Sequence, residues 1–176
     1  GGNAFAADQE MFEHFIAGQL EHTLEMTLLY APQINSYKRF AEGSFAPTAV
    51  TWGKDNRTCS FRVVGHGEGL RVENRLPGAD VNPYLAISAM IAAGLDGIDR
   101  KLTLPPACEG NAYVSDAERV PTNMYAARDL FRDSPLANEA FGEEMVRHSF
   151  HRAEYEIESF EKAITDWEHF RGFERL

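Results

Sequence analysis

The stretch that most constrains the fold runs through residues 56–75, NRTCSFRVVGHGEGLRVENR. Residues 58–64 are rich in the residue types that favour strands, residues 65–69 carry three glycines, and residues 70–76 resume a strand-like alternation. This pattern predicts two short strands joined by a Gly-rich turn.

Side chains alternate across a strand, so one face of the second strand carries Arg71, Glu73 and Arg75. Ser60 and Arg62 share one face of the first strand. A carboxylate between two arginines should stay ionised, because neighbouring cations favour the charged form. The arginines outnumber the carboxylate, which suggests that a ligand supplies phosphate or carboxylate for bidentate contact. The alternative is a solvated face with ordinary salt bridges, which is common on exposed strands.

The charge distribution also favours a small anionic ligand. The net charge of −10 argues against a general nucleic-acid or anionic-membrane binder. Residues 38–75 carry a local charge of +3 and the remainder carries −13. The basic residues of this island are Lys38, Arg39, Lys54, Arg57, Arg62, Arg71 and Arg75.

A chain of 176 residues fits one domain with a real core. Cys59 and Cys108 are too few for a disulfide scaffold and lack zinc spacing, so we expect a reducing compartment and a cytoplasmic protein. We find no signal peptide and no apolar run of the roughly 18 residues that a membrane span needs.

The first helix is predicted to begin after a cap at Asp8 and to end before Pro32. His14 and His22 lie two turns apart on it, too far to share a metal, so we expect exposed or core-edge histidines. Residues 33–47 should form a loop long enough to be functional or mobile. Residues 48–52 should form a further short strand that leads into the central pair.

Asn82 and Pro83 predict the start of another helix. Apolar residues lie on nearly every side of this helix, so we expect the helix to be buried. A loop at 102–122 should precede a short helix at 123–131 and a second helical piece that begins at Ser134 and Pro135.

The last helix is predicted over residues 143–170 from a seven-residue apolar repeat. His148, His151 and Glu154 offer metal-ligand spacing, but they fall away from the apolar seam, so we expect a solvated face.

Five motifs follow one another in a specific order: NSYKR (35–39), NRTCSFR (56–62), RVENR (71–75), NPYLA (82–86) and AAGLDGI (92–98). Together they resemble the catalytic domain of the glutamine synthetase family. The resemblance covers nearly the whole chain and is strongest over residues 33–100. It implies an α+β fold in which an antiparallel sheet portion is flanked by helices.

The resemblance implies a role for each basic position of the motifs. Arg39 and Arg75 match arginines that hold the carboxylate of the substrate glutamate and nearby negative charge. Arg57 matches the arginine that contacts the transferred phosphate, so Arg57 and Arg39 are the expected catalytic residues. Arg62 and Arg71 match ligands of the nucleotide phosphates.

Glu73 matches a metal-binding glutamate at the site of the γ-phosphate of ATP. The implied reaction phosphorylates the γ-carboxylate of glutamate with ATP, after which an amine displaces phosphate to form an amide. Two metal ions, Mg²⁺ or Mn²⁺, and the arginines would stabilise the developing charge. Glutamate, ATP and an amine acceptor are the implied partners, in a ring-shaped homo-oligomer.

The chain departs from the family pattern at Phe45, within Gly43-Ser44-Phe45-Ala46-Pro47. The family has a flap glutamate here, which helps to accept a proton and to close the site around ammonium. Phenylalanine can do neither. We therefore expect an organic amine acceptor, such as a polyamine or ethanolamine, as in γ-glutamylamine ligases of the family. Glu42 lies close enough in sequence to substitute in part.

A second departure concerns the family's other metal carboxylates, its metal-binding histidine and its small N-terminal β domain. All of them lie upstream of the motif that Gly1 matches, so residues 1–176 are interpreted as the C-terminal portion of the catalytic domain. This portion has one of six expected protein metal ligands and should be inactive alone. Tyr113 lies where some bacterial members carry an adenylylated tyrosine, although an ordinary loop tyrosine is the better interpretation.

Two alternatives remain open at this point. The first is a non-catalytic, structural member of the same fold, against which the retained arginines and Glu73 argue. The second is an unrelated anion-binding α+β module.

Overall fold

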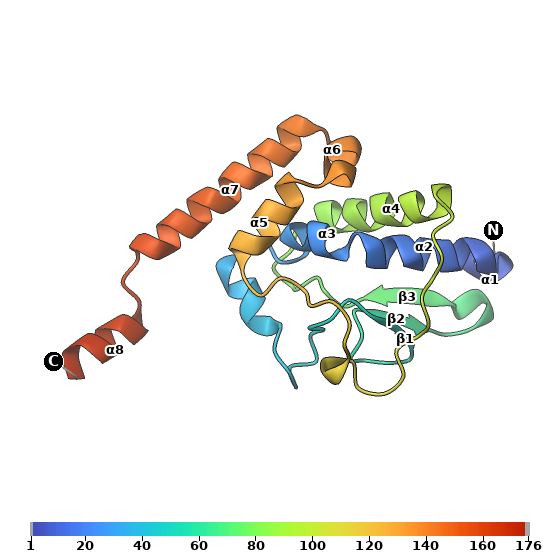
Figure 1. Cartoon of the computed structure of the whole chain (residues 1–176), viewed down its shortest axis with the longest axis horizontal. Helices are drawn as coiled ribbons and strands as arrows, with labels where there is room; N and C mark the ends of the chain where they lie inside the picture. The colour runs from blue at the N-terminus through green and yellow to red at the C-terminus, as the bar shows by residue number, and fades with distance from the viewer. Residues whose placement is uncertain (1, 175–176) are drawn as a thin grey trace.

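The computed structural model describes residues 2–174. Figure 1 shows a small sheet covered on one side by helices, with a helical arm (residues 143–174) that leaves the body toward the C-terminus. In chain order the helices are α1 (Ala4–Ala7), α2 (Gln9–Glu21), α3 (Thr23–Tyr30), α4 (Pro83–Asp99), α5 (Met124–Arg132), α6 (Pro135–Phe141), α7 (Glu143–Lys162) and α8 (Asp166–Glu174). Among the described residues, no helix is long and apolar enough to cross a membrane.

The sheet consists of β1 (Trp52–Lys54), β2 (Phe61–Val64) and β3 (Arg71–Asn74), in that order. The predicted hairpin is confirmed, because β2 and β3 pair antiparallel with Arg62 opposite Glu73. The short 3₁₀ helix η2 (Gly67–Gly69) lies within its turn.

The expected antiparallel sheet portion is confirmed only in part: β2 and β3 are antiparallel, but β1 pairs parallel with β2, so the sheet is mixed. The strand expected at residues 48–52 also begins only at Trp52. Its first residues pair elsewhere: the amide of Val50 donates to the carbonyl of Glu118 over 2.8 Å, and the amide of Val120 donates to the carbonyl of Thr48.

The two faces of the sheet differ as the alternation predicts. Phe61 and Val63 are buried, and Val63 packs with Phe12 and Ile16 of α2. The opposite face carries Arg62 and, by the register, Glu73. The helices therefore cover the apolar face and leave the charged face open.

Helix α2 packs closely on α4, and two glycines make this contact possible. A Cβ atom at Gly18 would lie 2.1 Å from the carbonyl oxygen of Ala93, and one at Gly97 would lie 2.2 Å from that of His14. Real side chains do not approach backbone atoms so closely, so neither position accepts even alanine without a shift of the helices.

The first helix is less regular than predicted. The side chain of Asp8 caps α2 as expected, accepting a hydrogen bond from the amide of Met11. However, the helix is interrupted at His22, whose ψ of 7° separates α2 from α3. Within the predicted 33–47 loop, residues Ile34–Arg39 form the 3₁₀ helix η1.

Helix α4 is not buried all round, which corrects the expectation from its composition. Its buried side is made of small residues (Ala86, Ala89, Ala93, Gly94 and Gly97), because close packing on α2 leaves room for nothing larger. Several large side chains point outward instead: Ile87, Ile91 and Leu95 are each at least 50% exposed, while Leu85 and Met90 pack against the core.

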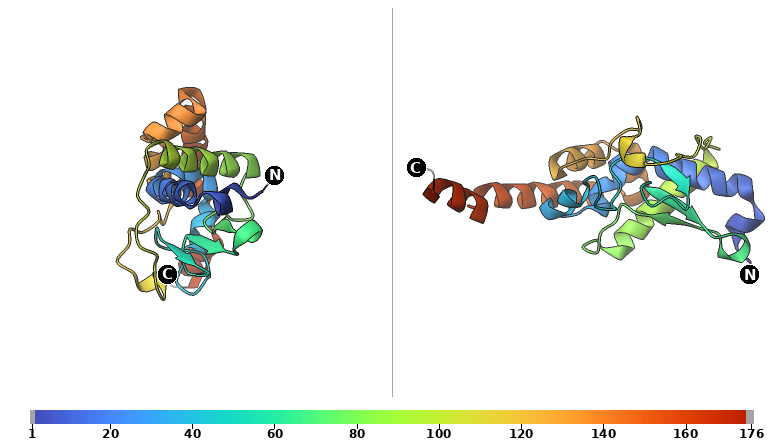
Figure 2. Two further views of the ribbon diagram at one scale, coloured as in Figure 1. Left: turned by 90° about the vertical axis from the view of Figure 1, so that its right-hand side faces the viewer. Right: turned by 90° about the horizontal axis from the view of Figure 1, so that it is seen from below.

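The last predicted helix is two helices. The amide and hydroxyl of Thr165 donate to a carboxylate oxygen of Glu168, and the amide of Glu168 donates back to the Thr165 hydroxyl. This reciprocal cap starts a new helix, α8, so the apolar repeat does not continue through a single helix. Helix α7 packs on α5 and α6, whereas α8 extends beyond the body (Figures 1 and 2).

Candidate functional site

The charged face of the sheet is built around Glu73. Arg62 on the neighbouring strand donates from Nη1 to Oε2 of Glu73 over 3.0 Å, and Arg75 donates from Nη1 to Oε1 over 2.7 Å. Arg62 also pairs with Asp55 in the turn after β1, with Nε 3.0 Å from Oδ1. Hydrogen bonds to Asp55 and Glu73 raise the pKa of Arg62, so its positive charge is secure.

A cavity of about 250 Å³ opens on this face. It is lined by Phe45, Arg57, Arg62, Glu73 and Arg75, so three guanidinium groups meet one carboxylate. Within the described part of the chain, Arg57 makes no ion pair. The cavity thus retains the excess of positive charge that the sequence predicts, in a space of the size of a small anion.

The loop that carries Phe45 forms one wall of this cavity. Phe45 has a left-handed backbone, with a φ of 62°, and its side chain is 67% exposed. Arg75 donates from Nη2 to the Phe45 carbonyl over 2.8 Å, and the Tyr113 hydroxyl donates to the Ala46 carbonyl over 3.0 Å. These bonds hold an aromatic ring, rather than a carboxylate, beside the arginines. The Tyr113 hydroxyl therefore helps to hold this loop in place.

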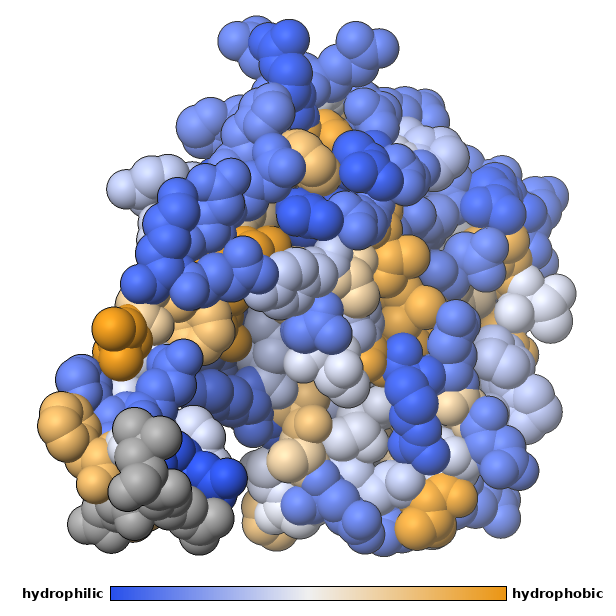
Figure 3. Space-filling model, turned by 60° about the vertical axis from the view of Figure 1, so that its left-hand side comes forward, coloured by the Kyte–Doolittle hydropathy of each residue, from blue (hydrophilic) through white to orange (hydrophobic). Residues whose placement is uncertain are grey.

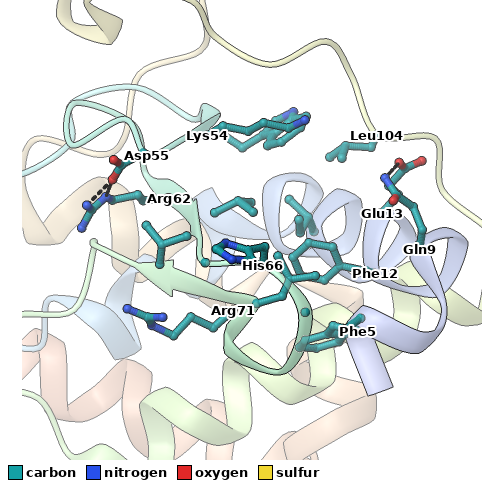
Figure 4. Close-up of a pocket in the computed structure, with 18 residues that line it drawn as sticks. Phe5, Gln9, Phe12, Glu13, Lys54, Asp55, Arg62, His66, Arg71 and Leu104 are labelled. Carbon is teal, nitrogen blue, oxygen red and sulfur yellow. Dashed lines mark hydrogen bonds and ion pairs between the residues drawn. The ribbon is translucent and has the colours of Figure 1, made fainter. Parts of the chain in front are cut away.

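A second, larger cavity of about 690 Å³ lies between the sheet and the N-terminal helices (Figure 4). One end carries Lys54, Arg62 and Arg71, and the other end carries the rings of Phe5 and Phe12. Arg62 lines both cavities, whereas Arg71 lines only this one. A charged end and an aromatic end together suit a ligand with phosphate and ring parts.

Arg39 lies outside both cavities. Its Nη2 donates to the carbonyl of Leu76, and its guanidinium lies over the Phe40 ring, 5.2 Å from the centroid. Burial lowers the pKa of Arg39, and the charge of nearby Arg75 acts in the same direction, while Asp80 opposes it. Arg39 is thus close to Arg75 but lines neither cavity in this structure.

The residues that the structure describes do not form a complete metal site. Glu73 is one carboxylate, and an arginine holds each of its oxygens. Across residues 2–174 there is no group of three His, Cys, Asp or Glu side chains that could hold a metal ion. Glu73 fits the contribution of a single ligand and no more.

His14 and His151 lie as expected from their positions. His22 is instead buried, at 8% exposed, which corrects the expectation of an exposed or core-edge ring. His14 Nδ1 lies 2.8 Å from the carbonyl oxygen of Leu102. His151 pairs with Glu154 over 2.9 Å on an exposed helix face. Sequence reasoning missed Asp55, whose only signal was its position two residues before Arg57.

Comparisons with known proteins show what the chain as a whole is similar to. The glutamine synthetase catalytic domain matches residues 1–171. A gamma-glutamylethanolamide synthetase of Streptomyces coelicolor is 56% identical over all of this chain and 39% of its own length. A glutamate–isopropylamine ligase of a Pseudomonas species is 40% identical over 90% of the chain and 36% of its own length.

A glutamine synthetase of Thermus thermophilus is 38% identical over 88% of the chain and 37% of its own length. A solved structure described as a GmaS/ADP complex aligns with a TM-score of 0.84 and 27% identity, over 98% of this chain and 41% of that one. The chain therefore spans about two fifths of the length of these relatives.

Proposed function

The chain belongs to the glutamine synthetase family, and from this premise we propose that it is the C-terminal portion of the catalytic domain of an ATP-dependent glutamate–amine ligase. The enzyme forms γ-glutamyl phosphate and then transfers the glutamyl group to an amine. The observation that carries the proposal is the cavity in which Arg57, Arg62 and Arg75 surround Glu73. A structural protein has no need of three arginines gathered around one carboxylate.

Each arginine has a task that its position suits. Arg75, together with neighbouring Arg39, holds the negative charge of glutamate. Arg57 has no competing ion pair in the described chain and contacts the phosphate in transfer. Arg62 and Arg71 hold nucleotide phosphates at the charged end of the larger cavity, whose aromatic end accepts the base. Guanidinium groups suit this chemistry, because they stabilise the charge that develops during phosphoryl transfer.

We assign Glu73 as one ligand of Mg²⁺ or Mn²⁺, with the other protein ligands outside this chain. When bound, the metal neutralises phosphate charge. Glu73 would hold the metal through lone pairs that Arg62 and Arg75 leave unused, because an ionised carboxylate offers about four acceptor sites.

The amine acceptor is an organic amine. The wall of the arginine cavity offers the Phe45 ring, which cannot take a proton or bind ammonium through a carboxylate. An aromatic ring instead provides apolar contact for the carbon chain of an amine. Two of the similar proteins are named for ethanolamide and isopropylamine ligation, which supports this choice.

The substitution Phe45→Glu tests the acceptor in the complete enzyme that carries this chain. We expect turnover with ammonium to rise and turnover with ethanolamine to fall, while Phe45→Leu changes the ammonium rate little because it adds no carboxylate. An unchanged ratio of the two rates in Phe45→Glu would show that Phe45 does not select the acceptor.

The substitution Arg57→Gln tests the phosphate contact. We expect glutamate-dependent ADP release to fall by about 10²–10³-fold, the usual effect of removing a donor to transition-state charge. Arg147→Gln, at an exposed position of α7, is the matched control. Equal rates in the two variants would remove Arg57 from the mechanism.

We also propose that the enzyme is a cytoplasmic homo-oligomer with a ring arrangement. Both cysteines are free thiols, which suits a reducing compartment. The arm and α4 expose large apolar side chains that a neighbouring chain would cover.

A further inference from the structure

A third cavity, of about 290 Å³, lies away from the arginine cavity and the larger cavity described above. It is formed by α3, the segment before η1, the start of α4 and the middle of α7. Its lining combines an apolar part with a polar part: Leu28, Leu29, Pro32 and Leu85, and Gln33, Asp80, Asn82, Ser149 and Arg152.

The two charged residues of this lining have opposite signs and do not pair with each other. No ion pair joins Arg152 and Asp80 in the described part of the chain. Arg152 donates from Nη2 to the Pro32 carbonyl over 3.0 Å, and Asp80 accepts the hydroxyl of Ser36 through Oδ2. Further guanidinium N–H groups and the second carboxylate oxygen remain for a ligand.

A buried hydroxyl on η1, on a residue that does not itself line the cavity, also lacks a partner. Tyr37 is 5% exposed, and its Oη makes no hydrogen bond among the described residues. Burial raises the pKa of Tyr37, while the charge of Arg152 lowers it and that of Asp80 raises it. The hydroxyl therefore lies within electrostatic reach of both charged groups of the cavity.

We propose that this cavity binds an L-α-amino acid with a small apolar side chain. The carboxylate of the ligand pairs with Arg152, its ammonium pairs with Asp80, and its side chain packs on the leucines. The volume lies at the lower end of the usual range for ligand pockets, which suits a molecule of this size. Asp80 also bonds to Ser36 of η1, so the site lies directly behind the segment that carries Arg39.

Calorimetric titration of the 176-residue chain with L-alanine, L-valine and L-leucine tests the proposal. Acetate and propylamine serve as half-ligands that each satisfy one charge only. We expect saturable binding of at least one amino acid and weaker binding of both half-ligands. Binding should weaken by about tenfold or more in Arg152→Gln and in Asp80→Asn, because each variant removes a charged partner. It should remain unchanged in Arg147→Gln, one turn earlier on the same helix.

Ser149→Met provides a second route if a charge variant does not fold, because the longer side chain fills the cavity without changing its charge. Binding should be lost in this variant while the unfolding transition is kept. Any of three results would overturn the proposal. No amino acid binds saturably, acetate binds as tightly as the amino acids, or binding persists both in Ser149→Met and, separately, in one of the charge variants.

Discussion

At the scale of single residues, His22 links three helices through its ring. Its Nε2 lies 2.6 Å from a carboxylate oxygen of Asp96 on α4, and its Nδ1 bonds to Glu25 on α3. Asp96 is also held by Arg100 over 2.9 Å. Burial alone would lower the pKa of His22, but the two carboxylates outweigh burial and the net pKa is raised.

This pKa predicts how stability depends on pH. A raised pKa in the folded state means that the protonated ring stabilises the fold fully below the unfolded pKa of about 6.5, and that this contribution is lost as the pH rises through the folded pKa. We expect the free energy of unfolding of the native chain to exceed that of His22→Gln most at about pH 6, and the difference to shrink toward about pH 9. Urea unfolding across this range measures it, and a difference that grows with pH would contradict the assignment.

Tyr113 sets the position of the loop that carries Phe45. The substitution Tyr113→Phe removes the hydrogen bond to the buried Ala46 carbonyl, so we expect a loss of about 0.5–1.5 kcal/mol in the free energy of unfolding. Amides of residues 43–46 should exchange hydrogen faster. The exposed Tyr155 is the control, since Tyr155→Phe removes no hydrogen bond in the described chain. Equal exchange in the two variants would show that Tyr113 does not restrain the loop.

At the scale of elements, the contact between α2 and α4 predicts a sharp effect of one methyl group. The substitution Gly97→Ala places a Cβ atom 2.2 Å from the His14 carbonyl oxygen, so the helices must move apart. We expect a loss of about 1–3 kcal/mol in the free energy of unfolding. Gly172→Ala in α8 is the control, because nothing lies within 4 Å of its added Cβ. Denaturant unfolding that shows no difference between the two variants would refute this close packing.

The hairpin and the caps could be predicted from sequence because they are local. Strand alternation alone places Arg62 and Glu73 on the open face, and the Asp8 cap needs only its own helix. The late start of β1 could not be predicted, because residues 48–50 bond to residues 118–120, far along the chain. The outward face of α4 was missed for a similar reason, since its buried side depends on glycines of another helix.

The site was predictable to the extent that it lies on the hairpin. Arg57, Arg62, Glu73 and Arg75 meet at one cavity, whereas Arg71 belongs to the larger cavity and Arg39 to neither. Alternation along a strand predicts which face a side chain is on. It does not predict which of two cavities a long side chain such as that of Arg71 will line. The contribution of Asp55 depends on the turn after β1, where its backbone has a φ of 49°.

At the scale of the whole molecule, the arm is the most exposed apolar feature. Trp167 is 67% exposed, and Ile164, Phe170 and Phe173 are exposed beside it. Figure 3 shows hydrophobic side chains along this projection at its lower left. Such a surface favours association.

We therefore expect the 176-residue chain to self-associate with rising concentration, as light scattering would record. The double variant Trp167→Glu with Phe170→Glu should reduce the average mass, because it places charge in the apolar surface. Glu158→Gln with Lys162→Gln is the control and removes an exposed ion pair on the same arm. A monomer at every concentration would contradict the expectation.

The central claim is that this chain completes a glutamate–amine ligase whose acceptor is an organic amine. The most direct test measures glutamate-dependent ADP release by the complete enzyme that carries the chain, with ammonium compared against ethanolamine, putrescine and spermidine. We expect faster turnover with at least one organic amine than with ammonium. Ammonium as the best acceptor would contradict the role of Phe45, and no ADP release with any amine would indicate a structural member of the family.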